Sequence, residues 1–219
     1  MADTKPIAFA DDGRLATREL VRRFKALGHS ADLGARLETL EALDRQYGGR
    51  ARLTLEDVAE LVASIVVDLS LLDDADLVIG VALWAIRHEV PLEAPEPVVN
   101  ALAQRSNETT GKEELAAIIA LMEAVIANVR PHLEADLERS NPERPWRILH
   151  ANLAITAIRT EEAVLMDSAF DALEAALPDE ASSFYSEALA LALAPGISPV
   201  VKERIEARIN RGQTTVSSP

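Results

Sequence analysis

The chain has 219 residues, 48% of them hydrophobic and 26% charged, and a formal net charge of −14. This composition is typical of a folded globular protein with a sizeable core, and it excludes disorder of the whole chain. Because the chain contains no cysteine, disulfides, thiol catalysis and cysteine-ligated metal sites are excluded as well.

The charge is unevenly spread along the chain. Residues 1–52 hold ten Lys/Arg and eight Asp/Glu, whereas residues 53–219 hold 12 and 28. An acidic body repels nucleic acid and anionic membranes, so any contact with nucleic acid would have to come from the N-terminal quarter. The first nine residues lack the long apolar core of a signal peptide, and the longest uncharged apolar run, residues 77–86, is too short to cross a bilayer as a helix. We therefore expect a cytoplasmic protein without a membrane contact.

The first predicted helix covers about residues 14–27 and ends at Gly28. Four basic residues follow i, i+4, i+8, i+11 spacing and share one face, while Val21, Phe24 and Leu27 lie on another face suited to packing. The members of this basic stripe are Arg14, Arg18, Arg22 and Lys25. The stripe is the predicted partner-binding site, for an acidic protein, for the chain's own acidic body or for a second subunit. A merely solvated face is the alternative interpretation.

The next predicted helices are 32–47, which ends at Gly48-Gly49, and two with strong periodicity. Apolar residues recur at i, i+3, i+4 and i+7 over 55–69 and again over 115–129, which places an apolar stripe on one face of each helix. Acidic residues in the first turn of each helix agree with these starts, because the helix dipole favours negative charge there.

A predicted helix over 74–88 is apolar on nearly every side, which is typical of a central, buried helix. Its pocket candidates are Trp84, Arg87 and His88, where the imidazole would act as an acid or base. The alternative is a core tryptophan with a histidine at the helix C-terminus, where its cation is favoured. Three aspartates near residue 74 fit helix capping. The alternative, a diphosphate-binding motif, would need an acidic residue at position 77, where Leu77 stands.

The remaining predicted helices cover residues 96–104, 144–159, 161–177, 179–194 and 199–210, and breaks are expected at 91–97, 105–112 and 140–145. Residues 131–138 either extend the helix before them beyond a kink or begin a new one. No segment alternates as a strand does. The sequence thus predicts an all-α protein of about ten helices, as a multi-helix bundle or as stacked, α-solenoid-like helical hairpins. It forms one domain, or two halves over 12–90 and 95–210, with mobile tails at 1–10 and 211–219.

One stretch, about residues 147–180, carries a residue pattern shared with a known repeat family. Counting back from a closing proline, large, small and aromatic residues fall at the family's positions: Leu153, Ala154, Ala157, Phe170 and Pro178. In this respect the stretch resembles a tetratricopeptide repeat, which implies paired helices and a protein-binding scaffold. It departs from the pattern at Met166 and Leu173, where alanine is usual. An ordinary amphipathic helical hairpin is the alternative.

The sequence contains few residue patterns that are typical of a catalytic or metal-binding site. None of the four histidines has glutamate three residues before it, so the helical di-iron motif is absent, and no metal site or cofactor is predicted. A cluster of Trp146, Arg147 and His150 fits a packed helix start after Pro145. The leading hypothesis is therefore a protein–protein interaction scaffold, adaptor or regulatory protein, bound to another protein or to its own second subunit. The alternatives are an enzyme with a pocket near Trp84 and His88, and a regulator that contacts nucleic acid through its N-terminal helix.

Overall fold

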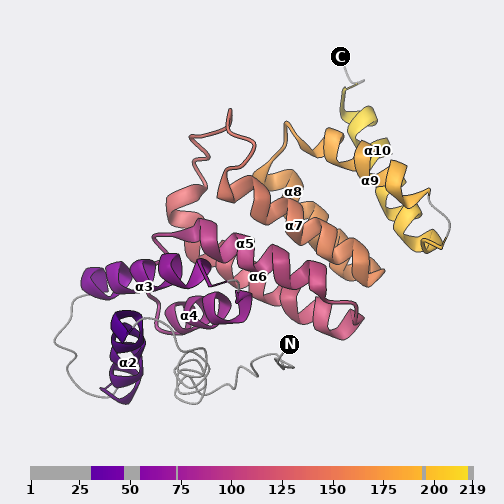
Figure 1. Cartoon of the computed structure of the whole chain (residues 1–219). Coiled ribbons are helices and arrows are strands. Elements are labelled where there is room, and N and C mark those ends of the chain that lie inside the picture. Colours follow the sequence, from indigo (N-terminus) through magenta and orange to yellow (C-terminus); the bar gives the residue numbers. More distant parts are fainter. Residues whose placement is uncertain (1–30, 47–54, 73, 194–195, 217–219) are drawn as a thin grey trace. The chain divides into compact units, whose positions relative to one another are not determined.

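The computed structural model describes residues 31–46, 55–72, 74–193 and 196–216, and within these ranges all regular secondary structure is helical (Figure 1). The described helices are α2 (Ala31–Gln46), α3 (Leu55–Ser70), α4 (Ala75–Arg87), α5 (Pro95–Glu108), α6 (Lys112–Leu133), α7 (Pro145–Thr160), α8 (Ala163–Ala176), α9 (Ala181–Ala192) and α10 (Pro199–Val216). The all-α fold class of about ten helices is confirmed. The predicted helix over 14–27 and its basic stripe lie outside the described residues, as does the predicted tail over 1–10.

The contacts divide the chain into two compact units. The first comprises residues 1–105 together with 124–132, and the second comprises 106–123 together with 133–219. Helix α6 therefore contributes residues to both units.

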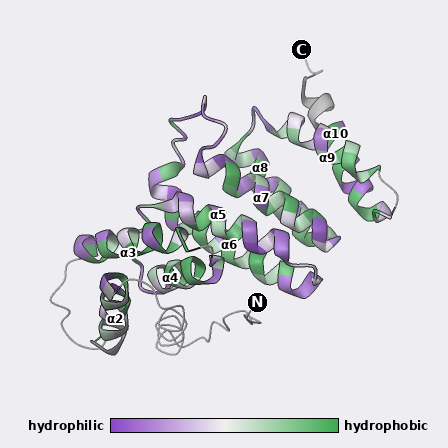
Figure 2. Cartoon of the chain, viewed as in Figure 1, coloured by the Kyte–Doolittle hydropathy of each residue, from purple (hydrophilic) through white to green (hydrophobic). Residues whose placement is uncertain are grey.

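In the first unit, α3 packs against both α2 and α4. The predicted stripe over 55–69 is buried at Val58, Ala59, Val62, Ile65, Val66 and Leu69, whereas its first member, Leu55, is 54% exposed. Helix α4 is hydrophobic along most of its ribbon (Figure 2) and is buried on several sides, with its largest side chain, Trp84, only 2% exposed. Its start is capped as predicted, because the Asp74 carboxylate accepts a hydrogen bond from the backbone N–H of Leu77 at 3.3 Å.

The predicted start of α5 is confirmed and its predicted end is wrong. Helix α5 begins at Pro95, one residue before its predicted start, and it accepts this proline because a proline in the first turn lacks an N–H that the helix would leave unpaired in any case. It runs to Glu108, beyond its predicted end, and the Arg159 guanidinium donates to the backbone carbonyls of Ser106 and Thr109 at 2.6 and 2.5 Å. This side chain satisfies carbonyls that the helix end leaves unpaired.

Helix α6 continues through Pro131 to Leu133, so the extension rather than a new helix is observed. Its length and composition alone would also allow it to cross a membrane. Its apolar stripe is nevertheless part of the core, with every member of the predicted set buried: Leu115, Ile118, Ile119, Met122, Val125, Ile126 and Val129.

In the second unit, α7 and α8 pack side by side as a helical hairpin, and α9 lies beside α10 (Figure 1). Helix α10 also contacts α8. Charged pairs join α10 to α8. Arg204 donates to Asp167 at 3.0 Å, and the buried Arg208 donates to Asp171 and stacks over the ring of Phe170 at 5.6 Å. Helix α10 extends to Val216, so it includes residues that were predicted to form a tail.

Candidate functional site

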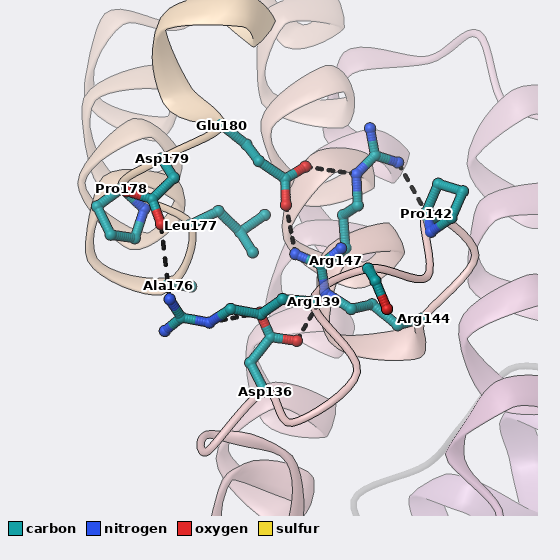
Figure 3. Close-up of a pocket in the computed structure, with 11 residues that line it drawn as sticks. Asp136, Arg139, Pro142, Arg144, Arg147, Ala176, Leu177, Pro178, Asp179 and Glu180 are labelled. Atoms are coloured by element: carbon teal, nitrogen blue, oxygen red, sulfur yellow. Dashed lines mark hydrogen bonds and ion pairs between the residues drawn. The ribbon is translucent and has the colours of Figure 1, made fainter.

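A polar cavity of about 370 Å³ lies in the second unit, where the loop between α6 and α7 meets the turn between α8 and α9 (Figure 3). The loop, residues 134–144, is hydrophilic along most of its trace (Figure 2). The charged residues that line the cavity are Asp136, Arg139, Arg144, Arg147, Asp179 and Glu180. Three cations and three anions therefore meet in one place.

Arg144 is the centre of this cluster. Its side chain and that of Asp136 are each 5% exposed, and its Nε donates to the Asp136 carboxylate at 2.7 Å. The same guanidinium donates through Nη2 to Glu180 and through Nη1 to the carbonyl of Asn141 at 3.1 Å. A buried arginine with its donors directed at fixed acceptors holds the loop against the start of α9, since every partner it loses would leave a buried charge unpaired.

Glu180 joins Arg144 to Arg147. Arg147 donates from Nε to Glu180 at 2.5 Å and from Nη1 to the carbonyl of Pro142 at 3.1 Å (Figure 3). Burial alone would raise the pKa of the Glu180 carboxyl, but the hydrogen bonds and charges of the two arginines outweigh it and lower that pKa below 4.5. Glu180 is therefore an anion at neutral pH and serves as an acceptor rather than as a proton donor.

Arg139 is held far more loosely. Its side chain is 65% exposed, and its guanidinium lies 3.9 Å from Asp136 and 3.5 Å from the exposed Asp179. Exposed ion pairs contribute only about 0–1 kcal/mol. Arg139 can therefore turn towards an anionic group on a ligand at little energetic cost.

A second hollow of about 170 Å³ adjoins the cavity and shares Arg147, Leu177, Asp179 and Glu180 with it. It adds apolar side chains from three helices: Ala151 of α7, Leu173 of α8 and Phe184 of α9. We call the cavity and the hollow together the charged groove. It combines apolar side chains with charged ones, as ligand-binding sites commonly do, and Glu187 adds a carboxylate to the hollow.

The chemistry of the charged groove favours recognition. Its arginines are paired with the carboxylates of Asp136, Asp179 and Glu180, while the carboxylate of Glu187 accepts a hydrogen bond from Ser183. The lining residues include no histidine, lysine or tyrosine. Within the part of the chain that the structure describes, no group of three or more His, Asp or Glu side chains is arranged to hold a metal ion.

The pocket candidates from the sequence lie in the first unit and do not line the charged groove. Trp84 is buried with its ring centroid 4.5 Å from that of His88, which is half-buried, and Arg87 is exposed. Geometrically this is a core tryptophan beside a histidine that ends the helix, since His88 is the C-cap of α4.

The cluster after Pro145 lies partly in the charged groove. Trp146 and His150 are buried as a packed helix start, with the ring nitrogen Nδ1 of His150 2.8 Å from the Trp146 carbonyl. Arg147, between them in sequence, faces the groove instead. The residues that sequence reasoning missed are Asp136, Arg139, Arg144 and the Asp179-Glu180 pair. The available signal was a set of charges beside the prolines at 145 and 178, where the chain turns.

Comparison of the chain with family models, with curated proteins and with solved structures finds no match.

Proposed function

We propose that the chain is a helical interaction scaffold that binds a segment of another protein in the charged groove. The observation that carries this proposal is the groove itself, in which the hollow lined by Phe184 adjoins the cavity lined by the loosely held guanidinium of Arg139. A folded scaffold that recognises a peptide needs these two elements: a hollow for an apolar side chain and a polar group that fixes orientation.

The chemistry of the groove defines the partner segment. An apolar side chain would lie against Leu173 and Phe184, and an acidic residue beside it would draw Arg139 away from Asp179. The buried ion pairs of Arg144 make one wall of the groove rigid. A rigid wall reduces the conformational entropy that is lost when a partner binds. The resemblance of residues 147–180 to a tetratricopeptide repeat supports the same proposal, because α7 and α8 pair as its helices would. The proposal assigns the chain an adaptor or regulatory role, and its location in the cytoplasm is a further part of the proposal.

The test is affinity capture from the native cell with the full chain as bait, followed by identification of the captured proteins. The groove variant combines Arg139→Glu with Phe184→Ala. The matched control combines Arg87→Glu with Leu71→Ala, two exposed positions outside the groove. We expect the groove variant to lose proteins that both the unmodified chain and the control capture, and the captured amount to fall as salt rises. An identical set of captured proteins for all three baits would contradict the proposal.

A further inference from the structure

The charged groove carries charges of opposite sign at its two ends, along one face of α9. Glu180, Ser183, Phe184 and Glu187 follow i, i+3, i+4, i+7 spacing, and all four line the hollow. Glu180 accepts hydrogen bonds from two arginines at the start of α9, Phe184 lies one turn further on, and Glu187 lies one turn beyond Phe184. This face therefore runs from a cluster of arginines, past an aromatic ring, to a carboxylate.

The arginine end has donors that the described part of the chain does not use. There, Arg139 forms ion pairs at 3.5 Å with Asp179 and at 3.9 Å with Asp136 but donates no hydrogen bond (Figure 3). Arg147 donates from Nε and Nη1, whereas its Nη2 has no acceptor among the described residues. Asp179 is 83% exposed, so it can leave Arg139 at little energetic cost. An acidic side chain of a ligand can therefore take the place of Asp179.

The opposite end of the groove is a carboxylate without a cation. Glu187 is exposed and accepts a hydrogen bond from Ser183 at 3.3 Å, and no lysine or arginine among the described residues forms an ion pair with it. The hollow is lined by three carboxylates, those of Asp179, Glu180 and Glu187, and by one guanidinium, that of Arg147. This excess of negative charge opposes a second acidic group at the Glu187 end and favours a basic one.

We infer, on the basis of the proposed function, that the bound segment is dipolar: an acidic residue for Arg139, an apolar side chain for Phe184 and a basic residue for Glu187. The helix rises roughly 10 Å from Glu180 to Glu187 at about 1.5 Å per residue. An extended peptide covers that distance in about three residues, at roughly 3.3 Å each. The acidic and basic residues of the partner are therefore about three positions apart, with the apolar residue between them.

The first measurement compares four tetrapeptides whose ends are acetylated and amidated, so that only their side chains are charged. They are Asp-Leu-Ala-Lys, Asp-Leu-Ala-Gln, Gln-Leu-Ala-Lys and Asp-Leu-Ala-Glu, each titrated into the isotope-labelled full chain and followed by nuclear magnetic resonance. We expect Asp-Leu-Ala-Lys to bind most tightly and the loss of either charge to weaken binding by about two- to fivefold, the range of an exposed ion pair. Equal dissociation constants for all four peptides, or no binding of Asp-Leu-Ala-Lys, would overturn the inference.

The second measurement reverses the charge at one end of the groove. In Glu187→Lys the two-acid peptide Asp-Leu-Ala-Glu should become the tightest of the four, because its second carboxylate then meets a cation. Glu203→Lys is the matched control, since Glu203 is an exposed carboxylate of α10 that does not line the groove, and it should leave the order of the peptides unchanged. Unchanged far-UV circular dichroism establishes that each variant is folded. An order that Glu187→Lys leaves unchanged, or that Glu203→Lys alters equally, would contradict the inference.

Affinity capture distinguishes a failure of this inference from a failure of the proposed function. If the groove variant Arg139→Glu, Phe184→Ala loses partners but Glu187→Lys keeps all of them, the groove binds proteins and the dipolar pattern is wrong. If the groove variant keeps every partner, the proposed function itself is wrong.

Discussion

Replacing Arg144 with methionine removes the central charge of the groove while keeping most of the side chain's length. The Asp136 carboxylate, 5% exposed, would lose the donor that lies 2.7 Å away, and Glu180 would keep only Arg147. Breaking a buried ion pair by deleting one partner costs about 3–5 kcal/mol, because the other charge stays buried without compensation. For a protein of this size, such a loss lowers the melting temperature by roughly 6–20 °C. Urea and thermal unfolding followed by circular dichroism measure both quantities.

Arg139→Met is the matched control for this experiment. It removes the same type of charge from the same cavity, but its side chain is 65% exposed and its ion pairs are longer, so we expect a loss of about 1 kcal/mol or less. A second substitution, Asp136→Leu in the Arg144→Met background, should restore part of the stability because it removes the stranded carboxylate. If Arg144→Met cost no more than Arg139→Met, the buried network would not hold the loop, and the rigid wall that the proposed groove needs would be absent.

Three further predictions concern stability. Trp84→Ala should cost about 3–5 kcal/mol in urea unfolding, since the ring is 2% exposed, and an unchanged midpoint would show that the ring is not part of the core. Glu89→Gly should stabilise the chain by about 1 kcal/mol or less, because Glu89 follows α4 with φ of 56°, a conformation in which glycine is favoured; a lower melting temperature would contradict this. Glu180 stabilises the folded chain at pH values above its ordinary pKa of 4.5. This contribution is lost as the pH falls through the lower pKa that Glu180 has in the folded state. The difference in unfolding free energy between the unmodified chain and Glu180→Gln should therefore shrink on acidification below pH 4.5, and a constant difference would show that the carboxylate's charge is not what matters.

The sequence was informative wherever the deciding interaction is local. The stripe of α3 follows from spacing alone, and the cap at Asp74 follows from its place before an apolar run, because both depend on residues within two turns of each other. The start of α5 is equally local and was predicted to within one residue, because the first turn of a helix accepts the prolines at 95 and 97.

The charged groove could not be predicted in the same way. Arg144 is separated in sequence from Asp136 by 8 residues and from Glu180 by 36, and Arg159 is separated from its partner at the end of α5 by more than 50. No periodicity relates such pairs, because only the packing of α7 against α8 and the path of the loop bring them together. The basic stripe at Arg14–Lys25 stays a prediction, since it lies outside the described residues.

Salt separates the two ways in which the proposed groove could hold a partner. An acidic residue of the partner held by Arg139 is released as salt screens the attraction, whereas an apolar side chain held against Leu173 and Phe184 is not. Partner capture by the unmodified chain should therefore fall as salt rises, and capture by Arg139→Met should depend less steeply on salt. If capture by the unmodified chain stayed constant or rose with salt, the partner would bind through apolar contacts alone, and Arg139 would have no part in its recognition.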